Sequence, residues 1–310
     1  MAIIDENDIW AVGEIYTEDT YTYDSLGNFL QPYNAAHWDG NKWELKRIKT
    51  AACGGVVYPP MQAIFAFSKD DIVFTNGAML IHYDGYNFVT DCSLIPSLTG
   101  GINKIWGTSS NDFYVVGNSG MIAHYDGKGW TKIESGTDLD LEDVTGNDLK
   151  VLTCGFWFES QLIKIENGQA GTLLHSGNYY ANLPDSKYGR FSALFYKEPF
   201  WYVWSTAGLM RFFRNFKSIY LTPARVIGTE NLRIVDISMN AVNDILLLDA
   251  FGVVLSFNGI RWKTDTKFLV KYGPGNLLTK RMDYKGRTVI IGGYHRSTDA
   301  AILILGQTTK

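Results

Sequence analysis

The sequence has few cysteines, and their arrangement suits neither a metal site nor a disulfide framework. Cys53, Cys92 and Cys154 are the three cysteines among 310 residues, and no two of them form a C-x-x-C pair. An odd, widely spaced trio is a poor zinc site and a poor disulfide scaffold. We therefore expect three small, buried hydrophobic side chains and no bound metal.

Charge is also scarce, and no hydrophobic run is long. Charged residues make up 19% of the chain and the formal net charge is -4. Proteins that bind nucleic acids or membrane surfaces need a positive field, and no apolar run reaches the roughly 20 residues that span a bilayer. The sequence therefore predicts neither nucleic-acid binding nor a membrane span, while 46% hydrophobic residues suffice for a large core.

The compartment stays open at this point. The first residues, "MAIIDENDIW", have neither the basic segment nor the apolar stretch of a signal peptide. Because the chain starts directly at a predicted strand, an extracytoplasmic protein from which a leader has been trimmed is an alternative.

The signatures of several enzyme classes are missing as well. The chain contains no G-x-S-x-G nucleophile motif, no phosphate-binding loop and no dinucleotide fingerprint. No Cys–His arrangement indicates a thiol nucleophile. We expect no cofactor, and catalysis has no support from a motif.

What the sequence does contain is a repeat in which Asn-Asp or a related pair precedes an apolar strand. The pairs are Asn7-Asp8, Asp70-Asp71, Asn111-Asp112, Asn147-Asp148 and Asn243-Asp244, with weaker equivalents at Glu198-Pro199 and Lys285-Gly286. Apart from the longer first interval, successive pairs are about 36–51 residues apart, which is near the period of a propeller blade.

A second marker, Asp-Gly or Asn-Gly, follows downstream in five of the units. These glycines are Gly40, Gly85, Gly127, Gly168 and Gly259. Such pairs tolerate the positive φ angles of a tight hairpin turn. In four units an aromatic residue stands three positions later, where a large ring can pack on the next strand; these are Trp43, Phe88, Trp130 and Trp262.

Each unit therefore reads as four antiparallel strands, which we call inner, second, third and outer. The sequence predicts an all-β, seven-bladed β-propeller in one domain, because such a sheet buries both faces only when neighbours cover it. The predicted blades span about 2–48, 60–95, 101–136, 139–176, 190–222, 232–268 and 276–310. The last blade has a missing or very short outer strand.

The stretch "IWGTSSNDFYVVGNSGMIAHYDGKGW" resembles the repeat of a broad group of bacterial propellers whose recurring skeleton is "WG-S-ND-VG-G-HYDG-W". The match is good over 102–136, fair over 5–45 and 62–95, and faint beyond 180. Many members of the group have no known function, so the resemblance implies the fold and not the chemistry.

Loops of variable length on one face of the propeller are the expected location of a binding site. The longest, Glu14–Asn34, holds four tyrosines and could be a contact surface or a decoration packed on the next blade. Its acids could bind calcium, but they lack the spacing of a known motif. In the other loops, aromatic and cationic side chains suit a sugar, a carboxylate or a peptide; these are Trp157, Tyr179, Arg190, Tyr294, His295 and Arg296.

Polar residues early in the inner strands should line the central channel, and two of them, Asn103 and Lys104, join the predicted ligand-binding set. The channel residues are Gln62, Asn103, Lys104, Glu142, Asp143, Asp236, Lys280 and Arg281. Such a channel can hold a small polar ligand or can be filled by water and mutual salt bridges. The repeated His37, His82 and His124 are expected to make local hydrogen bonds, because equivalent positions spread around a ring cannot converge on a metal.

These observations favour a non-catalytic binding or interaction module. Its partner, a small polar ligand, a glycan or a protein or peptide, would dock at the channel mouth on the face with the long loops. The alternative is a carbohydrate-active enzyme, either a glycoside hydrolase or a lyase, with Glu142 and Asp236 as acid and base within about 10 Å of each other. A third hypothesis is a propeller that forms one part of a larger assembly.

Overall fold

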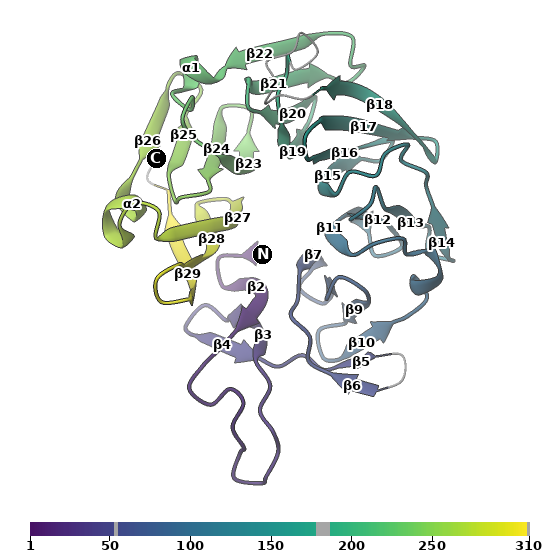
Figure 1. The fold of residues 1–310 in the computed structure, drawn as a ribbon, viewed down its shortest axis with the longest axis vertical. Coiled ribbons are helices and arrows are strands. Elements are labelled where there is room, and N and C mark those ends of the chain that lie inside the picture. The colour runs from purple at the N-terminus through teal and green to yellow at the C-terminus, as the bar shows by residue number, and fades with distance from the viewer. Residues whose placement is uncertain (53–54, 178–186, 309–310) are drawn as a thin grey trace.

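Seven antiparallel sheets stand around a central axis in the computed structural model, which describes residues 1–52, 55–177 and 187–308 (Figure 1). The innermost strands contact one another in order around the axis, and the last contacts the first, so the ring is closed. The predicted seven-bladed β-propeller is confirmed. We number the blades 1 to 7 in chain order.

Six sheets have four strands each, and the seventh has three among the described residues. Blades 1 to 4 contain β1 (Ala2–Asp5), β2 (Asp8–Ile15), β3 (Tyr33–Trp38) and β4 (Trp43–Lys46); β7 (Ala63–Ser68), β8 (Asp71–Thr75), β9 (Leu80–Tyr83) and β10 (Phe88–Asp91); β11 (Ile102–Ser109), β12 (Asp112–Gly117), β13 (Ile122–Tyr125) and β14 (Trp130–Lys132); and β15 (Leu141–Asn147), β16 (Lys150–Phe156), β17 (Ser160–Glu166) and β18 (Gln169–Ser176). Blades 5 to 7 contain β19 (Phe191–Lys197), β20 (Phe200–Ser205), β21 (Gly208–Phe213) and β22 (Ile219–Pro223); β23 (Ile234–Ala241), β24 (Asp244–Asp249), β25 (Val254–Phe257) and β26 (Trp262–Asp265); and β27 (Leu277–Lys285), β28 (Thr288–His295) and β29 (Ala300–Gln307).

Short elements that the repeat pattern did not predict lie between blades. A two-stranded hairpin, β5 (Thr50–Ala52) and β6 (Gly55–Val57), joins blades 1 and 2, and a 3-10 turn, η1 (Ile95–Ser97), follows blade 2. The helices α1 (Ala224–Ile227) and α2 (Lys267–Tyr272) follow blades 5 and 6. With four and six residues, these helices are too short to show a 3.6-residue period.

The two repeated markers meet at one edge of blades 1, 2, 3 and 6, on the side of the ring that we call the turn face. In blade 3, the Oδ1 atom of Asp126 accepts the backbone N–H groups of Lys128 and Gly129 at 2.9 and 3.0 Å. Gly127 in this turn has a φ of +82°, and a Cβ there would lie 3.2 Å from the Cβ of Asn111. The Asp-Gly turn therefore packs on the Asn-Asp turn beside it, which explains why both recur together.

The repeated histidines make the local contacts that the sequence predicts. The Nε2 atom of His37 lies 2.9 Å from Oδ1 of Asp8, and that of His124 lies 2.7 Å from Oδ1 of Asp112. His82 is 3.7 Å from Asp91. The histidine of the third strand thus approaches a carboxylate on a neighbouring strand of its own blade in all three cases.

The four aromatic residues after the glycines begin the outer strands, as expected. Each stands directly opposite another aromatic ring on the third strand; the pairs are Trp43 with Trp38, Phe88 with Tyr83, Trp130 with Tyr125 and Trp262 with Phe257. Their ring centroids are 4.6–5.7 Å apart. Such cross-strand pairs stabilise a short hairpin by up to about 1 kcal/mol relative to alanine.

The hydrophobic core lies between blades rather than within one. Trp10 of blade 1 packs with Ile72 and Phe74 of blade 2, and Trp204 of blade 5 packs with Leu247 of blade 6. Full burial of such a side chain stabilises the fold by roughly 1.5–3 kcal/mol. Each blade therefore depends on its neighbours for the burial of its faces.

Buried aspartates on the inner strands add directional links between blades. In three places the Oδ2 atom of such an aspartate accepts a backbone N–H of the next blade. The bonds run from Leu194 to Asp143, from Met282 to Asp236 and from Ile3 to Asp283, at 2.8, 2.8 and 2.7 Å. The last of them joins blade 7 to blade 1 and so closes the ring.

The prediction for the cysteines is only partly right. Cys154 is free and buried, as expected. Cys92 is disulfide-bonded, so the expectation of three unpaired hydrophobic side chains is wrong for this residue. Sequence spacing cannot detect such a bond, because the loops that carry two cysteines are brought together only by the fold. Cys53 lies outside the described residues.

Replacing Gly127 by alanine should destabilise the protein, because alanine disfavours the φ of +82° and its Cβ would crowd Asn111. We expect a loss of about 1–2 kcal/mol, seen as a melting temperature lowered by a few degrees. Gly129→Ala in the same turn is the matched control, because its Cβ meets nothing within 4 Å and its φ is not positive. Equal melting temperatures for the two variants would contradict this account of the turn.

Candidate functional site

The connections between second and third strands and those between successive blades emerge on the face opposite the turn face, which we call the loop face. Short turns occupy the turn face, whereas the loop face carries segments such as 16–32, which projects away from the ring (Figure 1). Three of the predicted ligand-binding residues, Trp157, Arg190 and Arg296, belong to these connections, and Tyr294 and His295 end the strand β28 beside them.

Two exposed aromatic side chains stand at the end of blade 4 on the loop face. Trp157 and Phe158 follow β16, are 69% and 61% exposed, and pack edge to face with ring centroids 5.8 Å apart. Beside them, the Nε2 atom of His175 lies 3.0 Å from Oε2 of Glu159. The two rings therefore present a large apolar surface to solvent.

Arg190 connects Phe156, the last residue of β16, to the next blade. Its guanidinium carbon lies 4.7 Å from the ring centroid of Phe156, the residue before Trp157. Its backbone pairs with Thr206, since the N–H of Arg190 donates to Oγ1 of Thr206 at 3.1 Å and the N–H of Thr206 donates to the carbonyl of Arg190 at 3.0 Å. The cation is thereby held between blades 4 and 5.

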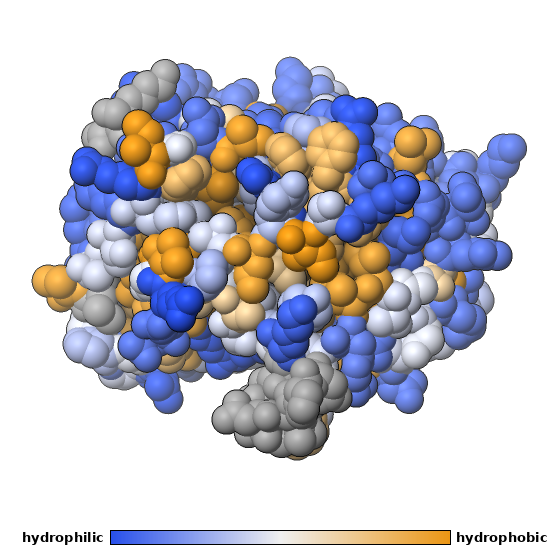
Figure 2. All heavy atoms as spheres, turned by 90° about the horizontal axis from the view of Figure 1, so that it is seen from above, coloured by the Kyte–Doolittle hydropathy of each residue, from blue (hydrophilic) through white to orange (hydrophobic). Residues whose placement is uncertain are grey.

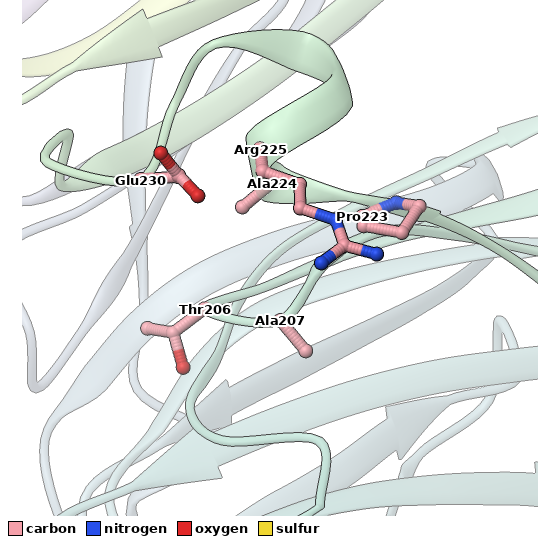
Figure 3. A pocket seen from close by; sticks show the side chains of 6 residues that line it. All are labelled: Thr206, Ala207, Pro223, Ala224, Arg225 and Glu230. Carbon is pink, nitrogen blue, oxygen red and sulfur yellow. The ribbon is translucent and has the colours of Figure 1, made fainter.

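Thr206 also lines an open cavity of about 320 Å³ between blade 5 and the connection to blade 6. The other lining residues are Ala207, Pro223, Ala224, Arg225 and Glu230. The side chain of Arg225 extends from α1 toward the turn at Ala207, and the carboxylate of Glu230 lies across from it (Figure 3). The cavity thus presents one charge of each sign and a hydroxyl group.

Five residues therefore follow one another along the loop face of blades 4 to 6: Trp157, Phe158, Arg190, Thr206 and Arg225. We call this set the loop-face track. Sequence reasoning identified Trp157 and Arg190. It missed Phe158, Thr206 and Arg225, although the length of the connection after Pro223 was a usable signal.

Tyr294, His295 and Arg296 form a second group, at the loop-face end of blade 7. The Nδ1 atom of His295 lies 3.1 Å from the hydroxyl of Ser297, and its ring lies 6.0 Å from that of Tyr272. The backbone N–H of Arg296 donates to the carbonyl of Asn276. This group is two blades away around the ring from Arg190, so the predicted residues form separate groups. Tyr179 lies outside the described residues.

Asn103 and Lys104 lie on β11, where their polar groups link blades. The amide nitrogen of Asn103 donates to the carbonyl of Leu141 at 3.1 Å, and Nζ of Lys104 lies 3.2 Å from Oδ1 of the buried Asp143. Across the channel, Arg281 donates to the carbonyl oxygen of Glu142 at 2.8 Å. The sequence left two alternatives for the channel: a small polar ligand, or water and salt bridges between its own charged residues. The pair of Lys104 and Asp143 is a salt bridge of the second kind.

The proposed acid–base pair of the enzyme alternative has raised pKa values. Burial raises the pKa of Glu142, an effect that the nearby Arg281 opposes. Burial also raises the pKa of Asp236, against the influence of Lys104 and Arg281. However, both carboxylate oxygens of Asp236 accept backbone N–H groups, from Ile237 and Met282. That arrangement suits a structural link, and the acid–base pair stays a prediction.

The segment Glu14–Asn34 extends beyond the blade as a hairpin with a single bridge between Tyr23 and Phe29. Arg47 holds its base. The Nε atom of Arg47 donates to the carbonyl of Gln31 at 2.6 Å, its Nη2 atom donates to Asp19 at 2.8 Å, and its guanidinium lies 3.7 Å from the ring centroid of Tyr33. The hydrogen bond from Arg47 lowers the pKa of Asp19 to about 2.

The described residues contain neither a cluster of metal ligands nor a helix that could span a membrane. No three histidine, cysteine, aspartate or glutamate side chains converge as a metal site would require, either in the hairpin or elsewhere in residues 1–52, 55–177 and 187–308. None of the helices in this part of the chain has the length and apolar character needed to cross a membrane.

No protein-family model matches the chain, and no curated protein sequence matches it. Several solved structures match the chain. YCF48 bound to D1 peptide matches with a TM-score of 0.65 and 14% identity, over 99% of this chain and 90% of that one. YCF48 from Cyanidioschyzon merolae matches with a TM-score of 0.62 and 13% identity, over 95% and 97% of the two chains.

The extracellular domain of a hybrid two-component system from B. thetaiotaomicron also matches, with a TM-score of 0.59 and 12% identity. The match covers 94% of this chain and 42% of the other, longer chain. At such low identities these likenesses concern the propeller fold alone.

Replacing Lys104 by methionine should destabilise the ring, because the buried Asp143 would lose the ammonium group that lies 3.2 Å from its Oδ1 atom. We expect urea unfolding to show a loss of about 1–3 kcal/mol. Lys128→Met, at an exposed turn of the same blade, is the control and should be near neutral. A loss of the same size in both variants would refute the role of the Lys104–Asp143 pair.

Removing the guanidinium of Arg47 should return the pKa of Asp19 from about 2 toward the ordinary value, near 3.9. Because the folded pKa is lowered, the contact stabilises the hairpin above the ordinary pKa and is lost as the pH falls through the folded value. NMR titration of the Asp19 carboxyl in Arg47→Ala and in the control Lys42→Ala measures this. An unchanged midpoint in Arg47→Ala would exclude Arg47 as the anchor.

Proposed function

We propose that this propeller is a non-catalytic binding module whose partner docks on the loop-face track. The observation that carries the proposal is the pair of exposed aromatic rings, Trp157 and Phe158. They directly follow Phe156, whose ring contacts Arg190, and Arg190 is bonded to Thr206 of the cavity wall. Loops held by a rigid scaffold are where binding usually resides.

The aromatic pair supplies the apolar contact. Burying one such ring against a partner would contribute roughly 1.5–3 kcal/mol, and aromatic and arginine side chains dominate the energetics of many interfaces. Trp157 has two flexible side-chain torsions and an N–H donor, so it gains contact area at little entropic cost.

The polar groups along the track favour a ligand with a carboxylate. Arg225 presents a guanidinium group in the cavity, and such groups bind carboxylates with two parallel hydrogen bonds. Glu230, across the cavity from Arg225, offers an acceptor for an amide or hydroxyl group. A peptide with an acidic residue next to an apolar one combines these features. The similar YCF48 structure is itself bound to a peptide, which supports this class of partner.

The disulfide bond of Cys92 supports an extracytoplasmic location. Disulfides persist in oxidising compartments and are rare in the reducing cytosol. We accordingly propose that the binding module works in such a compartment.

The experiment compares wild type with Trp157→Ala/Phe158→Ala on arrays of acidic–apolar peptides and of glycans. We expect peptide binding to weaken by about tenfold or more in the variant, because two contact rings are lost. Both side chains are largely exposed, so the melting temperature should not change. Tyr86→Ala, which removes an 89% exposed ring on the turn face, is the matched control. Binding that is lost equally in the control, or retained in the double variant, would reject the loop-face track.

A further inference from the structure

The hairpin between β2 and β3 of blade 1 carries a continuous row of exposed aromatic rings. Tyr16 and Tyr21 are each 55% exposed, Tyr23 is 69% exposed and Phe29 is 44% exposed. Three ring contacts join them, Tyr16 with Tyr21, Tyr21 with Phe29 and Tyr23 with Phe29, at centroid distances of 5.9, 6.0 and 5.3 Å. We call these four residues the aromatic ridge. The hairpin projects from the ring at blade 1, so the ridge lies apart from the loop-face track on blades 4 to 6 (Figure 1).

Hydrogen bonds fix the shape of the hairpin on which the ridge stands. The N–H of Tyr21 donates to the carbonyl of Leu30 at 2.7 Å, and the N–H of Leu30 donates to the carbonyl of Thr22 at 2.9 Å. Near the tip, Oδ1 of Asp24 accepts the N–H of Asn28 at 2.8 Å. A partner that contacts the ridge would therefore meet an ordered surface, and this lowers the entropic cost of binding.

The charge of the hairpin has a single sign. The segment Glu14–Asn34 contains four acidic residues and no lysine or arginine. Among the residues that the structure describes, one of these four acids has an ion pair, namely Asp19 with Arg47. Hydrogen bonds from Asn28 lower the pKa of Asp24, which therefore stays ionised at neutral pH. The hairpin thus carries uncompensated negative charge beside the aromatic ridge.

The base of the hairpin shows which group such a surface binds. The guanidinium of Arg47 lies 3.7 Å from the ring centroid of Tyr33 and 2.8 Å from Oδ2 of Asp19, and the Tyr33 hydroxyl donates to the same carboxylate. Further along the hairpin the Tyr16 hydroxyl donates to Oε1 of Glu14 at 2.7 Å. Within the described chain, no lysine or arginine makes an ion pair or a cation–π contact with either of these two residues. The second tyrosine–carboxylate pair therefore repeats the first without its guanidinium.

We propose that the aromatic ridge and the acids beside it bind an arginine-containing, basic segment of a partner protein. A guanidinium stacks on an aromatic face and donates hydrogen bonds to a carboxylate, as Arg47 does within the chain. Tyrosine and phenylalanine rings supply the apolar contact area that is typical of protein interfaces. A second copy of this chain fits the ridge less well, because its formal net charge of -4 opposes approach to an acidic hairpin.

Charge separates the ridge from another exposed apolar surface, on the rim of blade 5. Figure 2 looks toward that rim and shows apolar side chains among polar ones. Phe213, Ile219 and Leu221 of β21 and β22 are 37–43% exposed there. Arg214 and Lys217, in the turn between these two strands, are exposed as well. The apolar side chains of blade 5 thus stand beside cations, whereas the ridge stands beside acids, so a basic partner selects the hairpin.

The probe is a fluorescein-labelled octapeptide of alternating arginine and alanine, and the matched peptide carries citrulline in place of each arginine. Citrulline keeps the planar shape of the side chain and lacks its charge. By fluorescence anisotropy, we expect the arginine peptide to bind about tenfold or more tightly than the citrulline peptide. A lysine–alanine peptide should bind about threefold or more weakly than the arginine peptide, because an ammonium group neither stacks nor forms the paired hydrogen bonds of a guanidinium. In wild type, the arginine peptide should slow amide hydrogen exchange within residues 16–32.

Tyr16→Ala/Tyr23→Ala should weaken binding of the arginine peptide by about tenfold, because two ridge rings are lost. Tyr86→Ala/Tyr220→Ala removes two exposed rings from blades 2 and 5 and is the matched control, which should bind as wild type. Trp157→Ala/Phe158→Ala should also bind this peptide as wild type, so failure of the ridge and failure of the loop-face track are distinguishable.

Glu14→Gln/Glu18→Gln tests the charge and should weaken binding by about threefold or more. Glu6→Gln/Glu134→Gln removes the same number of exposed carboxylates elsewhere and should leave binding unchanged. Equal affinity for the arginine and citrulline peptides, or slowed exchange elsewhere and not within residues 16–32, would overturn the proposal. Both readouts use the wild type, so they decide even if a variant fails to fold. A dimer in sedimentation equilibrium that Tyr16→Ala/Tyr23→Ala abolishes would assign the ridge to a second copy and overturn it as well.

Discussion

Ring closure is the constraint on which the rest of the structure depends. A four-stranded blade is apolar on both faces, so it is stable only between two neighbours, and the seventh neighbour must meet the first. At that seam Ile290 of blade 7 packs with Ile3 and Ile9 of blade 1, and Asp283 accepts the N–H of Ile3. The hydrophobic contacts supply most of the free energy, whereas the hydrogen bond fixes the register of one blade against the next.

The same constraint separates the two faces of the molecule. Turn-face residues must satisfy the geometry of short hairpins, and this leaves little freedom at positions such as Asn111 and Gly127. Loop-face connections bear no such requirement, so their length and composition vary from the short turn at Ala207 to the hairpin anchored by Arg47. The groups available for binding consequently gather on the loop face, and the channel charges are engaged in holding the inner strands together.

Blade 7 closes the ring although its sheet has three strands among the described residues. Its inner strand β27 contacts both β23 and β1. Met282 and Ile291 of blade 7 share a buried cluster with Leu246 and Leu248 of blade 6, and Ile304 of β29 packs against the same cluster. All three strands of blade 7 therefore take part in the interblade core.

The sequence by itself determined the strands, the turns and the number of blades. These depend on local rules: the positive φ of glycine after Asp or Asn, the alternation of apolar residues and the spacing of Asn-Asp pairs. The aromatic and cationic residues of its loops predicted a binding role for Trp157, and that role remains a prediction. Only the tertiary structure decided which loops are neighbours. The contacts of Arg190 with Phe156 and Thr206 and the burial of Asp143 beside Lys104 join residues from different blades or connections. Sequence spacing carries no information on such contacts, since they arise from the packing of whole sheets around the axis.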